Sequence, residues 1–263
     1  MSALDAATIA KLAEHLEGCE LEAHDTVKIT DAHPGLSMED AYRIQDELRR
    51  RKVARGARVV GLKAGLTSRA KMRQMNVSEP VFGFLVDGYA VPDGGEVGAA
   101  GLIHPKVEPE IAFVLRAPLR GPGCHVAAVL QATDFVVAGL EVIDSRYRDF
   151  KFDLPSVVAD NCSSARFAVG GRMLRPGGVD LATLGVVLER NGETVALAAG
   201  AAVLGHPAAA VAALANHLGA RGQEIPAGAV ILSGGVTEAV PVKPGDHVAV
   251  HVQHLGTASL RFV

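Results

Sequence analysis

The stretch at positions 104–115 reads HPKVEPEIAFVL and joins two acidic residues to an apolar run. The run from Ile111 to Leu115 has the composition of a buried β-strand. Because side chains at positions i and i+2 of a strand point the same way, Glu108 and Glu110 should point together beside an apolar core. Pro109 between them lacks a backbone donor, so we expect a sheet edge or a β-bulge at this point.

A third acid, Glu141, follows the apolar segment 135–140. Two carboxylates held about 4 Å apart repel by roughly 4 kcal/mol at an effective dielectric near 20. Three carboxylates at one point must therefore either take up protons or hold a cation. Ligation by oxygen alone favours Mg²⁺ or Mn²⁺ over zinc. The alternative, a solvated Glu-x-Glu pair on a strand edge, stays open from spacing alone.

Lys63 is a lone charge in the apolar and glycine-rich stretch 59–68, VVGLKAGLTS. Burying an ammonium group is costly unless a partner is present. Lys63 could therefore stabilise negative charge that develops during a reaction. It could equally extend to water from the end of a strand.

Two polar turns are further candidates for a site. Asp160, Asn161 and Ser163 form a cluster after the basic and aromatic run 146–152, although such residues are also common in turns. Ser233-Gly234-Gly235 follows an apolar run and could offer backbone N–H groups to an anion, or be a plain turn. By contrast, the strand pattern places His247 and His251 toward solvent, so we expect no metal site there.

The composition limits the class of protein. The chain has 263 residues, of which 49% are hydrophobic, and a net charge of -3, which does not favour nucleic acid or a membrane surface as partner. The cysteine residues have no paired spacing, which suits a reducing cytoplasm. Residues 194–220 carry no Asp, Glu, Lys or Arg, but Gly200, Gly205 and Pro207 interrupt them, which favours a buried strand, a turn and a helix over a membrane span.

The order of patterns predicts an α+β fold in one folding unit, residues 1–263. Residues 1–56 form a helical segment, in which Ser37 is an N-cap and Asp40 its capping-box partner. Residues 57–263 form a mostly β body packed against that segment. Asn191-Gly192 between two β-branched runs predicts a hairpin, and alternation over 247–252 predicts a strand. One helix begins near Pro207.

Several of these segments together resemble the fumarylacetoacetate-hydrolase-like superfamily, and within it the branch of 2-hydroxypentadienoate hydratases and 4-oxalocrotonate decarboxylases. The resemblance runs from about His24 to the C-terminus. Its markers, in chain order, are GLKAGLTS at 61–68, HPKVEPE at 104–110, EVIDSR at 141–146, VADNCSS at 158–164, GHP at 205–207 and ILSGG at 231–235. The resemblance implies a mixed β-roll or barrel core of the fumarylacetoacetase C-terminal type, with helices around it.

The resemblance also implies roles for individual residues. They comprise metal ligation by Glu108, Glu110 and Glu141, catalytic roles for Lys63, Asp160 and Ser163, and substrate contacts by Leu62, Val81, Arg146, Asn161, Ser233 and Gly234. For Arg146 a structural salt bridge is an equal alternative to holding a substrate carboxylate. The implied cofactor is Mg²⁺ or Mn²⁺, with no organic cofactor. The implied partners are a small 2-oxo dicarboxylic acid, further copies of the chain and a hydratase.

Two positions distinguish the activities within this branch. Hydratases typically carry Gly-Lys-Lys and an acid in Pro-Asp-Phe-Gly, whereas here the corresponding residues are Leu62 and Val81. Without that acid we expect a reaction that adds no water, the decarboxylation of 2-oxo-3-hexenedioate to 2-hydroxypenta-2,4-dienoate. The alternatives are a hydratase of the same branch, a C–C bond hydrolase of the wider superfamily, and a non-catalytic subunit that stabilises a hydratase.

Overall fold

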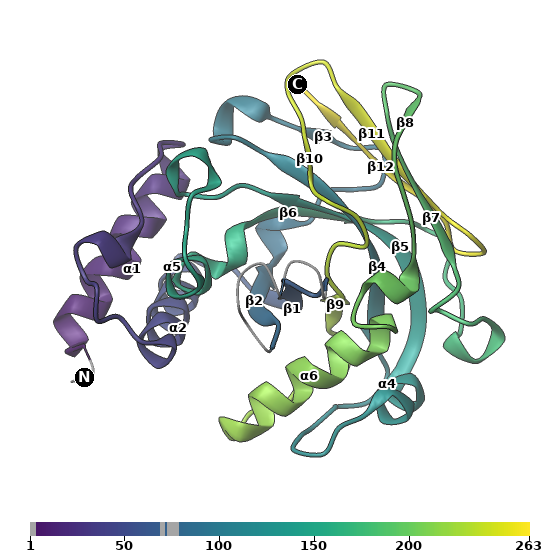
Figure 1. Ribbon diagram of the computed structural model, residues 1–263, viewed down its shortest axis with the longest axis horizontal. Coiled ribbons are helices and arrows are strands. Elements are labelled where there is room, and N and C mark those ends of the chain that lie inside the picture. The colour runs from purple at the N-terminus through teal and green to yellow at the C-terminus, as the bar shows by residue number, and fades with distance from the viewer. Residues whose placement is uncertain (1–3, 69–71, 73–78) are drawn as a thin grey trace.

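The structure is a computed structural model that describes residues 4–68, 72 and 79–263. Helices gather on two sides of a curled β body (Figure 1). The helices are α1 (Ala6–Leu21), α2 (Met38–Ala54), α4 (Val126–Ala132), α5 (Leu154–Ala159) and α6 (Pro207–Ala220). The strands are β1 (Val59–Gly65), β2 (Val81–Val86), β3 (Glu96–Val97), β4 (Lys106–Leu115), β5 (Thr133–Ile143), β6 (Ser164–Val169), β7 (Gly185–Arg190), β8 (Glu193–Ala199), β9 (Val230–Leu232), β10 (Val240–Pro241), β11 (His247–Val252) and β12 (Gly256–Phe262).

The strands form two sheets that meet at β5. The first has the order β2-β1-β9-β4-β5-β6, with β10 paired to one end of β4, and the second has the order β3-β12-β11-β7-β8. β11 and β12 pack against β5, which joins the sheets around one apolar core. Within the first sheet, β1 and β9 run parallel while β4 is antiparallel to both β5 and β9. The α+β class predicted from the sequence is therefore confirmed.

The N-terminal helices and α5 cover one side of the first sheet (Figure 1). The buried face of α1 includes Ile9, Leu12 and Leu16, in the helix that was predicted for this segment. The predicted capping box between Ser37 and Asp40 is present at the start of α2. The buried amide of Gln45 donates to the carbonyls of Phe82 and Val158, so it ties α2 to β2 and α5.

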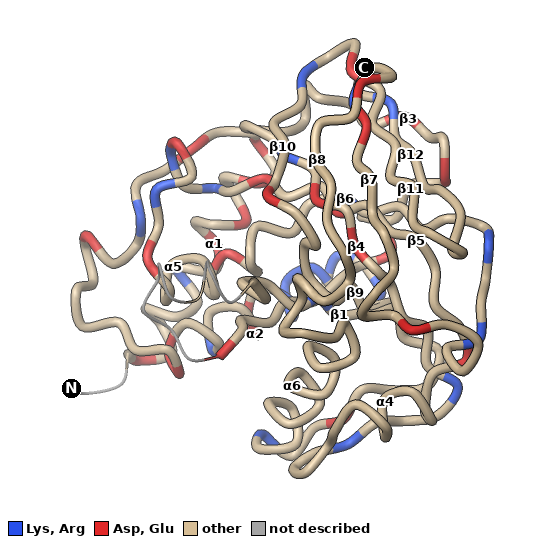
Figure 2. The backbone as a smooth tube through the Cα atoms, turned by 45° about the vertical axis from the view of Figure 1, so that its right-hand side comes forward, with Lys and Arg blue, Asp and Glu red and all other residues tan. Residues whose placement is uncertain are grey.

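The β body also follows its sequence patterns. β7 and β8 form the hairpin predicted at Asn191-Gly192, and β11 buries Val248, Val250 and Val252. The uncharged segment 194–220 forms most of β8, a turn and α6. No helix in the described part of the chain combines the length and apolarity needed to cross a bilayer. Basic and acidic segments are interspersed along the chain (Figure 2).

Pro109 lies in the middle of the long β4–β5 ladder. It is paired with Leu140 and the register does not shift there, so the predicted bulge is wrong. On the other side of β4, β10 pairs with residues 106–107 and β9 with residues 112–114. Pro109 therefore lies between the parts of β4 that pair with β10 and with β9. Its missing N–H thus removes no hydrogen bond to either of these strands.

Candidate active site

The acidic residues of β4 and β5 meet at one point on the first sheet. Glu108 lies directly opposite Glu141 in the antiparallel register, and Glu110 is two residues along the same face. Each of the three offers a carboxylate oxygen within 4.8 Å of the others. Glu110 and Glu141 are fully buried and Glu108 is half-buried. Strand pairing thus concentrates negative charge at a point that water hardly reaches.

Lys63 of β1 supplies a positive charge to this cluster. Its Nζ lies 2.7 Å from Glu141 Oε2 and donates to the carbonyl of Cys162 at 3.1 Å. Burial by itself would lower the pKa of Lys63, but the negative charges of Glu141 and its neighbours outweigh burial and raise it. Lys63 therefore stays protonated, and its predicted alternative of extending to water is wrong because its side chain is only 2% exposed.

The carboxylates resist ionisation even with Lys63 beside them. Burial, followed by the charge of Glu141, raises the pKa of Glu110 well above its ordinary value. Burial also raises the pKa of Glu141, against the opposing effect of Lys63. A single ammonium group therefore does not offset the cluster, and the site favours a further positive charge, either protons or a cation.

A glycine turn after β9 closes around the same carboxylates. The N–H of Gly234 donates to Glu110 Oε2 at 2.6 Å. Gly234 has a φ of +105°, and a Cβ there would lie 2.2 Å from the hydroxyl oxygen of Thr67. A Cβ on Gly235 would lie 2.8 Å from the carboxyl carbon of Glu108. The backbone of this turn therefore approaches the cluster so closely that neither position has room for a side chain.

The donor set fits a hard divalent cation. Glu110 Oε1 and Glu141 Oε1 are buried and accept no hydrogen bond within residues 4–68, 72 and 79–263. Buried carboxylate oxygens without donors are costly unless an ion coordinates them. Oxygen ligands at this spacing suit Mg²⁺ or Mn²⁺. The geometry agrees with the predicted ligands, and their binding of a metal stays a prediction.

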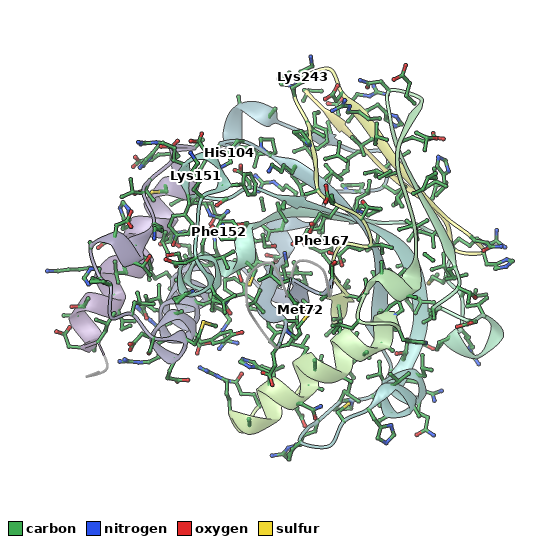
Figure 3. All side chains as sticks on the ribbon, in the orientation of Figure 1. Met72, His104, Lys151, Phe152, Phe167 and Lys243 are labelled. Atoms are coloured by element: carbon green, nitrogen blue, oxygen red, sulfur yellow. The ribbon has the colours of Figure 1, made fainter. Side chains whose placement is uncertain are left out.

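A cleft of about 420 Å³ opens above the cluster. Its walls are largely apolar, whereas its charged groups come from β1 and β4. The lining residues are Lys63, Gly65, Leu66, Val81, Lys106, Glu108, Ile143, Phe150, Phe152, Val157, Cys162, Ser163 and Ala239. Phe152 and His104 lie in the region between α5 and β10 (Figure 3). The cleft thus combines a charged floor with largely apolar walls.

The structure argues against the contact predicted between Arg146 and a substrate carboxylate. Arg146 is 1% exposed, and its guanidinium pairs with Asp160 and donates to the carbonyls of Asp160 and Ser164. Asp160 is fully buried in this pair, and neither it nor Arg146 is among the residues that line the cleft. The alternative reading of Arg146, a structural salt bridge, matches these contacts.

The Arg146–Asp160 pair supports a strained turn at the cleft. Asn161, Cys162 and Ser163 all have positive φ values, of 48°, 52° and 59°. The side-chain amide of Asn161 accepts from the backbone N–H of Phe84 at 2.9 Å and donates to the carbonyl of Phe84 at 3.0 Å. Of the predicted polar cluster, only Ser163 lines the cleft, while the carbonyl of Cys162 holds Lys63. Backbone strain of this kind occurs where surrounding contacts fix a functional geometry.

Of the other residues predicted to contact the substrate, only some reach the cleft. Val81 lines the cleft beside Gly65. Leu62 faces the opposite side of β1, toward α2 and α6, because neighbouring residues of a strand alternate. The N–H of Gly234 already donates to Glu110, and Ser233 is fully buried and does not line the cleft.

The sequence analysis missed Lys106, Phe150 and Phe152 as lining residues. The alternation that paired Glu108 with Glu110 also places Lys106 on their face, so this signal was present in the sequence.

Comparisons with known proteins agree with the fold. Residues 60–263 match the fumarylacetoacetate (FAA) hydrolase C-terminal family. A 4-oxalocrotonate decarboxylase of Pseudomonas sp. strain CF600 is 61% identical over 96% of both chains. A 2-hydroxyhexa-2,4-dienoate hydratase of Comamonas testosteroni is 43% identical over 91% of this chain and 92% of its own. The solved structure of 4-oxalocrotonate decarboxylase from Pseudomonas putida G7, complexed with magnesium and adipate, superposes over 100% of both chains with a TM-score of 0.98 and 57% identity.

Replacing Arg146 should destabilise the fold rather than affect a ligand directly. Because Arg146→Met leaves Asp160 buried without its partner, we expect the free energy of unfolding to fall by about 3–5 kcal/mol. Arg148→Met is the matched control, since Arg148 pairs with Asp25 at the surface and should contribute less than about 1 kcal/mol. Urea unfolding measures both losses, and equal losses would contradict the assigned role of Arg146.

Glu110→Gln should weaken Mg²⁺ binding by at least about tenfold in calorimetric titration. Because the change also removes one of three repelling charges and keeps an acceptor for Gly234, the melting temperature in EDTA should not fall. Glu141→Gln should weaken Mg²⁺ binding equally, but it should lower that melting temperature because Lys63 loses its partner. Glu193→Gln, on the exposed hairpin, is the control. Parental Mg²⁺ affinity in both site variants would place the ligands elsewhere.

Proposed function

The chain belongs to the fumarylacetoacetate (FAA) hydrolase C-terminal family, and from this premise we propose that it decarboxylates 2-oxo-3-hexenedioate (4-oxalocrotonate) to 2-hydroxypenta-2,4-dienoate and CO₂. It is a carboxy-lyase of the meta-cleavage catabolism of aromatic compounds. The observation that carries this function is the carboxylate cluster with its buried, charged Lys63 at the floor of an apolar-walled cleft.

Glu108, Glu110 and Glu141 would hold Mg²⁺ or Mn²⁺, the metal role that their geometry fits. A bound divalent cation supplies Lewis-acid stabilisation of negative charge on the 2-oxo oxygen. Lys63 stays protonated beside the cluster and adds a second, preorganised positive charge. The Cys162 carbonyl and Glu141 hold Lys63 at that point, so no reorganisation is needed during the reaction.

The substrate contains its own electron sink, so the reaction requires no organic cofactor. The bond from C5 to the departing carboxylate breaks, and its electron pair forms the C4=C5 alkene. The alkene between C3 and C4 shifts to C2=C3, and the C2 oxygen receives the negative charge, then a proton. Apolar walls formed by residues such as Val81, Val157 and Phe152 favour neutral CO₂ over the charged carboxylate.

The same walls support decarboxylation over hydration. Adding water requires groups that position it and transfer protons, which typically contribute about 10²–10⁴-fold in rate. Val81 is apolar and stands where hydratases of this branch carry an acid. The relatives nevertheless include a hydratase at 43% identity, so hydration is the second candidate that an assay must separate.

The remaining proposals concern the working form of the protein. Residues 1–56 and 57–263 would act as one catalytic domain, which is supported by an apolar cluster that α1 and α2 share with β2 and β5. The unpaired thiols, Cys19, Cys124 and Cys162, suit a cytoplasmic location. We also propose a homo-oligomer that associates with a hydratase, because the dienol product is the substrate of such an enzyme.

The purified protein with Mg²⁺ should release CO₂ from 2-oxo-3-hexenedioate and accumulate 2-hydroxypenta-2,4-dienoate or its keto tautomer. Little 4-hydroxy-2-oxopentanoate should form unless a hydratase is added, because Val81 stands where hydratases of this branch carry an acid. EDTA should abolish turnover, and Mg²⁺ or Mn²⁺ should restore it. Hydroxy acid formed from the dienol without CO₂ release from the diacid would identify a hydratase. The absence of both activities in metal-loaded protein would support the non-catalytic subunit.

Lys63→Met should lower kcat by about 10²–10³-fold, the usual effect of losing one preorganised electrostatic contact. Mg²⁺ affinity should change far less, because Lys63 is not a ligand. Lys243→Met, at an exposed residue remote from the cleft (Figure 3), should leave kcat unchanged. A Lys63→Met variant within a few-fold of the parent would remove Lys63 from the mechanism.

A further inference from the structure

Lys106 begins β4 on the same face as the metal-binding candidates. It is two residues before Glu108 and lies opposite Ile143, which is itself two residues after Glu141. Lys106 and Ile143 both line the cleft. Two residues of an antiparallel strand span roughly 7 Å, a distance similar to the reach of an extended six-carbon diacid. Lys106 therefore stands one substrate length from the carboxylate cluster.

The other buried, positively charged side chains near the cleft already form ion pairs. Lys63 is paired with Glu141, and Arg146 is paired with Asp160. Lys106 forms no ion pair with any acid in the described part of the chain. Its Nζ lies instead 3.9 Å from the centroid of the Phe150 ring. The donors of this half-buried ammonium are thus available to a ligand in the cleft.

Phe150 holds Lys106 in place through a constrained loop. Asp149 and Phe150 both have a φ of 56°, which is strained for residues other than glycine. The ring of His104 packs against Phe150 with their centroids 4.8 Å apart, and the backbone N–H of His104 donates to Asp144. The aromatic ring is therefore fixed between His104 and the ammonium group of Lys106, and a cation over such a face is attracted to it.

We propose that Lys106 binds the far carboxylate of the 2-oxo dicarboxylic acid, the group that leaves as CO₂, while the 2-oxo acid end lies at the cation that the carboxylate cluster would hold. This inference rests on the proposed function and assigns a specificity-determining residue to the same site. The product has lost the group that Lys106 binds, so it is held less tightly than the substrate. Lys106 thereby selects diacids over monoacids and favours product release.

The direction of the kinetic effect follows from the charge. An ammonium group beside the departing carboxylate stabilises the ground state, and that stabilisation disappears as the carboxylate becomes neutral CO₂. Removing Lys106 should therefore raise KM and should not lower kcat. A residue that stabilised the transition state would show the opposite pattern, a fall in kcat.

Calorimetric titration of the Mg²⁺-loaded protein can test the contact without turnover. The probes are adipate, a six-carbon diacid, and 2-oxopentanoate, which has the 2-oxo acid end alone. Lys106→Met should weaken adipate binding by about 10–100-fold, the usual loss for a hydrogen bond to a charged group. Affinity for 2-oxopentanoate should change by less than about twofold. Lys106→Arg should retain adipate binding, and Lys151→Met, at an exposed residue of the same loop, should match the parent.

Three results would overturn the inference. They are parental adipate affinity in Lys106→Met, an equal loss for both probes, and a kcat reduced at unchanged KM. Lys106→Gln, which keeps a polar side chain, gives the same comparison if the methionine variant does not fold. Failure of the proposed function would look different. In that case the parent protein itself would release no CO₂ from 2-oxo-3-hexenedioate, and neither would any variant at position 106.

Discussion

The mutual repulsion of three carboxylates is the constraint on which the rest of the site depends. The β4–β5 register places Glu108 against Glu141 with Glu110 beside them, and like charges opposite each other on a sheet are unfavourable. The surrounding groups offset this repulsion in part, through the ammonium of Lys63 and the N–H of Gly234. Both Gly234 and Gly235 are needed for that approach, since a side chain at either would collide with Thr67 or Glu108. The negative charge that these groups leave uncompensated favours a further positive charge, either protons or a cation.

A second buried ion pair, Arg146–Asp160, supports the Lys63–Glu141 pair although it does not line the cleft. Arg146 and Asp160 anchor the turn at residues 161–163, whose left-handed backbone directs the Cys162 carbonyl at Lys63. Buried ion pairs add little to stability compared with apolar packing, but the loss of one partner is costly. The pair therefore acts mainly by fixing where the turn lies, and through the turn it fixes where the ammonium of Lys63 points.

The polar and apolar groups of the cleft lie in different places. Negative charge and Lys63 form the floor, aromatic and aliphatic side chains form the walls, and Lys106 provides a positive charge at the far end of β4. With a cation on the carboxylates, such an arrangement would suit a diacid, and it would enclose the conjugated carbons between the two charged ends in an apolar medium. Loss of a charged group as CO₂ suits that medium, whereas the addition of water does not.

The sequence by itself determined the local elements, because strand alternation, helix caps and hairpin turns depend on residues a few positions apart. It predicted that Glu108 and Glu110 share a face, that Ser37 caps α2 and that Asn191-Gly192 turns a hairpin. The family resemblance grouped Glu108, Glu110 and Glu141 at one site, but only the tertiary structure decided how the buried charges pair. Long-range strand pairing placed Glu141 against Glu108 and Lys63 against Glu141, whereas Arg146 became enclosed with Asp160 instead of facing the cleft. The physical reason is that a buried charge takes its partner from strands and turns remote in the sequence, and local pattern carries no information about that choice.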